Sequence, residues 1–104
     1  MKTLLPILLL VTAAGFCFSQ PISFKGETTW HDGNFYRIQI GAYANQRNAE
    51  RTFAMLRNGG LDPQYGEYRQ LKRVMITRVR ARDIPTIIAR LQALGIREVW
   101  ITRE

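Results

Sequence analysis

The residues of this chain that could do chemistry are arginines, a glutamine and a tryptophan in strand-like segments. Arg37 and Gln39 alternate with isoleucines, and Arg73 begins a similar alternating stretch. An arginine presents a planar, permanently charged fork that pairs with carboxylates, and a glutamine amide both donates and accepts hydrogen bonds. Trp100 adds a large ring that can stack on a flat ligand. These residue types predict binding of a polar or anionic ligand.

No group of residues in the sequence predicts catalysis. The single histidine, His31, and the single cysteine, Cys17, form no nucleophile–base pair. Glu67, Asp83 and Glu98 lie on separate expected elements, which suits surface charges or a helix cap better than paired catalytic carboxylates. The sequence has no phosphate-binding loop or metal-ligand motif. We therefore expect no enzymatic activity, no metal site and no cofactor.

The elements that hold these residues occur twice along the chain. Residues 37–43 lead into a helical stretch that stops at Gly59, and residues 73–79 lead into another that stops at Gly95. A repeat of this length indicates two similar structural units. Each half predicts a strand, a helix, a glycine stop and a strand. The whole predicts an α+β fold of the βαββαβ (RNP or ferredoxin-like) type, a four-stranded antiparallel sheet with two helices on one face.

Alternation predicts which side chains leave the helix-covered face of this sheet. Tyr36, Ile38 and Ile40 are expected to face the core, as are Val74 and Ile76. Short links and right-handed crossovers favour the strand order fourth, first, third, second. The outward residues then form one candidate ligand-binding patch: Arg37, Gln39, Gly41, Arg73, Met75, Thr77 and Trp100.

The first residues have the pattern of an export signal. A lysine at position 2 precedes an apolar run, and small residues occupy the cleavage positions before Gln20. We expect a cleaved signal peptide over residues 1–19, a linker or tether over residues 20–34 and a single domain over residues 35–104. An uncleaved anchor or a lipid on Cys17 are the alternatives, and only these would attach the protein to a membrane. The expected location is the periplasm or cell envelope.

The charge of the chain suggests what it meets after export. The formal net charge is +7, and loss of residues 1–19, with one lysine and no acid, leaves +6. An exported domain this basic is expected to meet a polyanion, a membrane surface or an acidic polysaccharide.

The stretch Tyr36–Tyr43, followed by Ala49, Leu56 and Gly59, resembles the first half of a SPOR (sporulation-related repeat) domain. Residues 73–76 are similar to the start of its second half, and the resemblance covers about residues 35–103. The family usually continues with Gly-Pro-Phe where this chain has Thr77-Arg78-Val79, which predicts a differently shaped turn.

The resemblance implies binding to peptidoglycan, with a preference for glycan strands stripped of stem peptides, as found at division septa. Gln39 and Arg73 are assigned to the binding site by their motif positions. Divisome proteins or cell-wall enzymes are possible partners. The free lactyl carboxylate of naked glycan suits an arginine on the sheet.

Two alternatives come from other classes of protein. A secreted adaptor could bind a protein through the edge strand near Tyr65. Single-stranded nucleic-acid binders share the same plan and stack bases on strand aromatics. The export signal and the scarcity of outward aromatics argue against nucleic acid as a partner.

Overall fold

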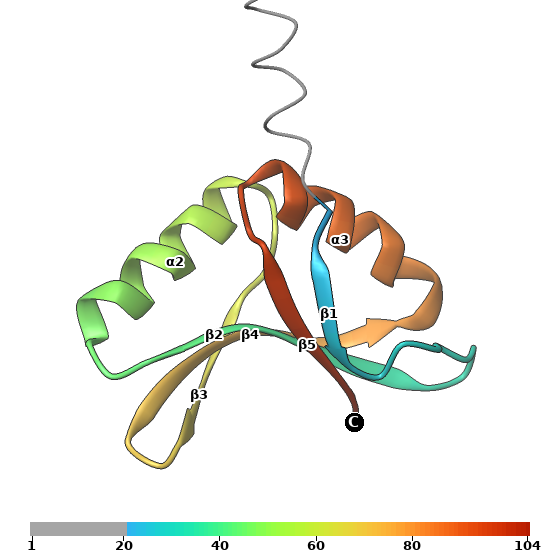
Figure 1. Cartoon of the computed structure of the whole chain (residues 1–104), viewed down its shortest axis with the longest axis horizontal. Coiled ribbons are helices and arrows are strands. Elements are labelled where there is room, and N and C mark those ends of the chain that lie inside the picture. Colours follow the sequence, from blue (N-terminus) through green and yellow to red (C-terminus); the bar gives the residue numbers. More distant parts are fainter. Residues whose placement is uncertain (1–20) are drawn as a thin grey trace, which may run out of the picture.

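The computed structural model describes residues 21–104, which form one sheet with two longer helices on one of its faces (Figure 1). The strands lie in the order β1-β5-β2-β4-β3. The α+β class and the placement of both helices on one face are confirmed. The elements in chain order are β1 (Ser23–Gly26), β2 (Phe35–Tyr43), α2 (Gln46–Asn58), β3 (Gln64–Tyr68), β4 (Leu71–Arg80), the 3-10 helix η1 (Ala81–Asp83), α3 (Ile84–Ala93) and β5 (Glu98–Arg103).

The four strands predicted from the repeat have the predicted arrangement. β2 and β4 are antiparallel neighbours, with β5 beside β2 and β3 beside β4, both antiparallel. A fifth strand, β1, pairs in parallel with β5. The prediction of a four-stranded sheet is therefore wrong by one strand. β1 lies in the segment expected to be a linker, and its four residues are too few to show a hydrophobic alternation.

The core lies between the sheet and the two helices. Tyr36 and Ile38 of β2 are buried, as their alternation predicts, and Leu56 of α2 and Leu91 of α3 are buried against them. Ile22, directly before β1, belongs to the same cluster. Removal of this apolar surface from water holds the helices on the sheet, and Ile22 extends the core to the edge strand.

The helices begin and end at residues suited to those positions. The Asn45 side chain accepts a hydrogen bond of 2.8 Å from the backbone N–H of Arg47 at the start of α2. Gly60, just after α2, has a φ of +84°, and Gly95, just after α3, has a φ of +91°. Glycine adopts this left-handed conformation at little cost, so the chain can leave each helix and turn toward the next strand.

A bulge interrupts the pairing of β4 with β2 near its end. Tyr36 pairs with Val79, but Ile38 pairs with Ile76, so β4 holds one extra residue between these pairs. Arg78 lies in this interval with a φ of +56°, a value that side-chain-bearing residues seldom adopt. The bulge releases the Arg78 backbone from the regular ladder.

A second bulge lies in β2. Gln39 pairs with Met75, but Gly41 pairs with Val74, so Ile40 is the extra residue. An extra residue reverses which side of the sheet the following positions face. The second half of β2 is therefore out of phase with the alternation read from its first half.

Candidate ligand-binding face

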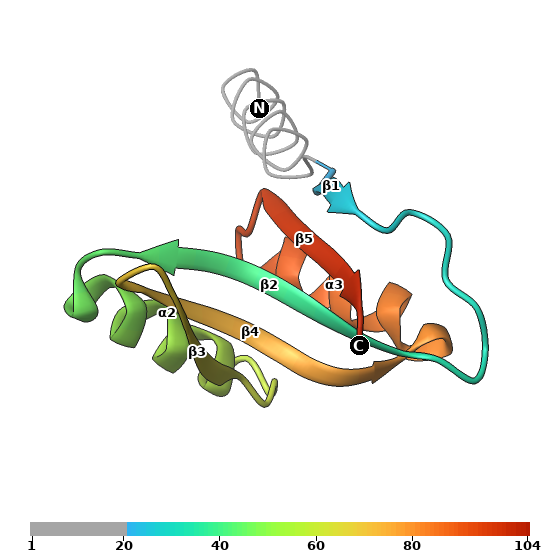
Figure 2. The ribbon, with the colours of Figure 1, turned by 90° about the horizontal axis from the view of Figure 1, so that it is seen from below.

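The sheet face opposite the helices, which we call the outer face, carries the candidate site. Seen from below, the strands lie in front of α2 and α3, and no helix of residues 21–104 covers this side (Figure 2). The strand register places one row of side chains across the outer face, with one residue from each of the five strands. This row consists of Lys25, Trp100, Gln39, Met75 and Gln64.

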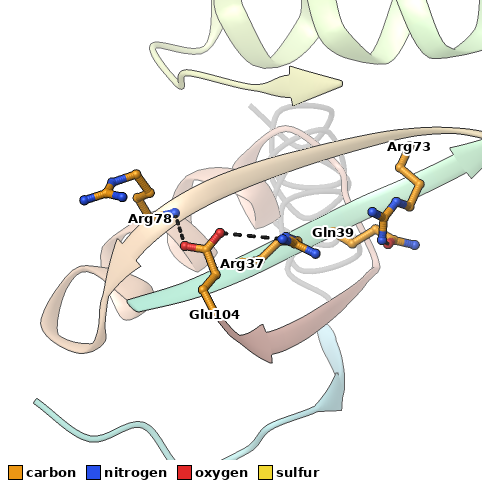
Figure 3. A network of polar contacts seen from close by, with 5 residues as sticks. All are labelled: Arg37, Gln39, Arg73, Arg78 and Glu104. Carbon is orange, nitrogen blue, oxygen red and sulfur yellow. Dashed lines mark hydrogen bonds and ion pairs between the residues drawn. The ribbon is translucent and has the colours of Figure 1, made fainter. Parts of the chain in front are cut away.

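Gln39 and Arg73 form the polar centre of the outer face (Figure 3). Nη1 of Arg73 donates a hydrogen bond of 3.3 Å to Oε1 of Gln39 across the β2–β4 pair. The Arg73 guanidinium also lies 6.0 Å from the ring centre of Tyr68 on β3. The Nε atoms of Arg37 and Arg73 are both buried and have no hydrogen-bond partner within residues 21–104. Both guanidinium groups therefore reach outward through their terminal nitrogens.

Trp100 lies beside Gln39 and is 49% exposed. Its neighbour in the row on the other side, Lys25, comes from β1. A shallow hollow of about 260 Å³ adjoins the tryptophan, and Gln39, Gly41 and Glu98 contribute to its lining. An exposed aromatic ring next to amide and carboxylate groups can cover one face of a sugar ring while the polar groups bind its hydroxyls.

Met75 reaches the outer face as predicted, but it is only 7% exposed. It covers Gly66 of β3, where an added Cβ would collide with the Met75 methyl group and come within 3.4 Å of the Arg73 side chain. Met75 is therefore part of the floor of the face, since Gly66 leaves room for it to lie flat. The sequence prediction placed it as an exposed contact, and this exposure is not found.

Gly41 does not face outward, and its predicted placement is wrong. The Ile40 bulge pairs Gly41 with the fully buried Val74, so its missing side chain would point to the helix side. A Cβ there would collide with the Tyr43 hydroxyl. That hydroxyl accepts a hydrogen bond of 3.0 Å from Thr52 of α2. Gly41 thus makes room for a contact between sheet and helix.

Arg37 and Thr77 lie on the outer face at the other bulge, as predicted. Thr77 alternates with the buried Ile76 and is partly exposed. Nη2 of Arg37 lies 3.8 Å from Oε2 of Glu104, and Oε1 of Glu104 accepts a hydrogen bond of 2.9 Å from the backbone N–H of Arg78 (Figure 3). The structure thus brings every predicted site residue except Gly41 to one face, and their part in ligand binding remains a prediction.

Tyr68, which is 54% exposed on this face, was not predicted from the sequence. Tyr68 and Phe35, which is 37% exposed, each add an aromatic surface to that of Trp100. The spacing of Gln64, Gly66 and Tyr68 could have revealed Tyr68, because alternate residues of a strand share a face. Phe35 borders a second hollow of about 440 Å³ that the loop before β2 and η1 line, with Arg80 at its rim.

Basic residues outnumber acids on the outer face. Lysine or arginine occurs at positions 25, 37, 73, 78 and 80, against Glu98 and Glu104. No three His, Cys, Asp or Glu side chains within residues 21–104 gather as a metal site would require. The face is therefore a cationic surface with exposed aromatic rings, which suits an anionic ligand with flat apolar faces.

This fold and face define a class of α+β domains with an open, basic sheet. The family model of the SPOR domain matches residues 32–95, more than half of the chain, and the chain therefore belongs to the SPOR domain family.

A solved structure has a similar fold. The solution structure of the peptidoglycan binding domain of the B. subtilis cell wall lytic enzyme CwlC matches with a TM-score of 0.58 and 22% identity. The match covers 75% of this chain and 99% of that domain. A search of curated proteins found no match. Neither α2 nor α3 in the described part of the chain is long and apolar enough to cross a membrane.

Proposed function

We propose that this protein is a peptidoglycan-binding module, not an enzyme, and that it recognises glycan strands through its outer face. Membership of the SPOR domain family supports this proposal. The fold it shares with the peptidoglycan binding domain of CwlC adds to that support. The proposed ligand is the glycan strand itself, with a preference for strands from which stem peptides have been removed.

The observation that carries the proposal is the set formed by Trp100, Gln39 and Arg73. They lie on three adjacent strands of one uncovered face, with Gln39 in the middle. The Trp100 ring covers the C–H face of a sugar, and the Gln39 amide binds an acetamido or hydroxyl group. Arg73 adds a fixed positive charge beside them. Together they match a ligand that is flat, polar and anionic at intervals.

The preference for stripped strands follows from the charge of the ligand. Each muramic acid residue carries a lactyl carboxylate when no stem peptide is attached, and amide formation with a peptide removes that charge. A guanidinium group pairs strongly with a free carboxylate. The basic outer face therefore binds a strand without stem peptides more tightly than a strand that carries them.

The same proposal gives the protein a place in the cell. Residues 1–19, which lie outside the described residues, have the composition of an export signal, so the protein works in the periplasm or cell envelope. Stripped glycan gathers at division septa, and the protein acts there in division or envelope remodelling. Divisome proteins or cell-wall enzymes are its proposed neighbours.

A sedimentation assay tests the proposal. The purified protein should pellet with isolated sacculi, and more of it should pellet after an amidase has removed the stem peptides. Gln39→Ala combined with Trp100→Ala should abolish pelleting. Arg51→Ala, which removes an exposed arginine from α2 on the opposite side, is the control. Binding that survives the double substitution in a folded protein would place the site elsewhere.

A protein partner at the open edge of β3 is a second candidate, and the exposure of Tyr65 and Tyr68 at this edge favours it. A peptide could add a strand there through backbone hydrogen bonds. Capture of envelope proteins that is lost on substitution within β3, and kept in the Gln39/Trp100 double variant, would identify this mode of binding.

A further inference from the structure

One carboxylate of the chain itself already lies on the outer face. Glu104 accepts a hydrogen bond of 2.9 Å from the backbone N–H of Arg78, and its other oxygen is 3.8 Å from Nη2 of Arg37. Figure 3 shows the carboxylate between these two groups. A backbone N–H and a guanidinium group thus converge on a single carboxylate.

The bulge in β4 makes the backbone donor available. The bulge interrupts the β2–β4 ladder at Arg78, and the Arg78 N–H pairs with Glu104 instead. The residue holds a φ of +56° although it is not glycine. A side-chain-bearing residue in this conformation is uncommon and is a reason to look for a function at that position.

The surroundings of this carboxylate are cationic. The Arg78 guanidinium lies 5.0 Å from the ring centre of Phe35, and Arg80 pairs with Phe35 across β2 and β4. The Arg37 side chain keeps 35% of its surface exposed, so an incoming anion can reach it from solvent. Glu104 is held by one hydrogen bond and one loose, partly exposed ion pair, and a pair at this distance contributes little stability.

We propose that the Arg78 N–H and the Arg37 guanidinium form a second carboxylate site on the outer face, which Glu104 fills when no ligand is bound. A carboxylate of the ligand displaces Glu104, which makes Glu104 an internal competitor that sets the affinity. The identity of this ligand as a muramic acid carboxylate rests on the proposed function. The existence of the site does not.

The position of the site suits a polymer with repeated charges. Arg37 and Gln39 are two residues apart on the same face of β2, a separation of about 7 Å along a strand. The carboxylate at Glu104 and the Gln39–Arg73 pair therefore lie next to each other. A strand that reaches both would bind through two anionic groups.

Nuclear magnetic resonance of the Arg78 amide tests the site directly. N-acetylmuramic acid carries the lactyl carboxylate, and N-acetylglucosamine lacks it. In Glu104→Ala the acid sugar should shift the Arg78 amide signal, and the neutral sugar should not. The dissociation constant should fall by about threefold or more relative to the unaltered protein. Glu104→Gln keeps a neutral hydrogen-bond acceptor, and its dissociation constant should lie between those of Glu104→Ala and the unaltered protein.

The control for net charge is Glu50→Ala, since Glu50 is an exposed residue of α2 whose carboxylate accepts a hydrogen bond from the Gln46 side chain. The proposed site would be overturned if Glu50→Ala lowered the dissociation constant as much as Glu104→Ala does. It would also be overturned if the acid sugar did not shift the Arg78 amide signal in Glu104→Ala. Thermal melting shows whether each variant is folded.

The two proposals fail in different ways. If the acid sugar shifts the Arg78 amide but no variant pellets with sacculi, the carboxylate site stands and peptidoglycan binding falls. If the protein pellets with sacculi and Glu104→Ala changes nothing, peptidoglycan binding stands and the competitor role of Glu104 falls.

Discussion

Gln39 and Arg73, 34 residues apart in the sequence, are joined by a hydrogen bond of 3.3 Å from the guanidinium to the amide oxygen. The bond fixes how the amide is turned, because its oxygen faces Arg73 and its NH₂ group is left for another acceptor. It also holds the guanidinium over the boundary between β2 and β4. The proposed binding site therefore has hydrogen-bond donors from both residues.

Gln39→Glu should weaken glycan binding by about tenfold, which corresponds to about 1.4 kcal/mol. The new carboxylate would pair with Arg73 and repel a carboxylate of the ligand. The free energy of unfolding should change by less than about 1 kcal/mol, because in this partly buried pair the new attraction is offset by lost hydration of the two charges. Co-sedimentation and thermal melting measure the two effects. Gln46→Glu on α2 adds the same charge away from the face and should bind normally.

Arg73→Lys should reduce affinity about fivefold, or about 1 kcal/mol, although the charge is kept. Lysine lacks the planar fork that can hold Gln39 and a carboxylate at once. Titration with soluble glycan fragments at two salt concentrations checks this. The binding of both proteins should weaken as salt rises, because salt screens exposed charges. Equal affinity for the two proteins would argue against a specific role for the guanidinium.

Trp100→Ala should cost about 1.4 kcal/mol or more of binding free energy, a tenfold loss, as expected for an aromatic anchor. Trp100→Phe should retain part of the affinity because it keeps a ring. Phe24→Ala is the matched control, since Phe24 is 41% exposed and pairs with the buried Val99, away from the outer face. A change in tryptophan fluorescence during titration of the unaltered protein would report contact of the glycan with the ring. An unchanged spectrum at saturation would contradict the role of Trp100.

Gly41→Ala should destabilise the fold by about 1–3 kcal/mol, because its Cβ would collide with the Tyr43 hydroxyl. In a Tyr43→Ala background the same substitution should cost less than about 0.5 kcal/mol, and a double-mutant cycle measures this coupling. Chemical denaturation supplies the free energies. Glycan binding by the folded fraction should be unchanged, and a specific loss of binding would restore Gly41 as a ligand contact.

The alternation in β2 and β4 predicts much of the candidate site correctly. Side-chain direction in a strand has a period of two, and burial of Ile38 and Ile76 fixes the phase. Gln39 and Arg37 must then face outward whatever the exact pairing. This part of the site could be read from the sequence because it depends on local pattern alone.

The rest depends on register, which local pattern does not contain. The bulge at Ile40 reverses the phase of Gly41. A glycine inside a strand can mark either a bulge or a close approach of a neighbouring group, so Gly41 alone does not fix the register. The contact of Glu104 with Arg78 requires the bulge in β4 and the approach of a residue 26 positions further along the sequence. Strand β1 was missed because its pairing with β5 involves backbone hydrogen bonds that any residue can make.

The buried Nε atoms of Arg37 and Arg73 restrict the direction from which an anion can approach. A carboxylate often binds an arginine side-on, by accepting hydrogen bonds from Nε and one terminal nitrogen. Because Nε is buried at both residues, an anion can bind them only through the terminal Nη atoms. A glycan strand bound as proposed must therefore bring its acidic groups to these terminal nitrogens. Anionic polymers that cannot turn their charges to one side should be rejected by shape, however strongly the face attracts them.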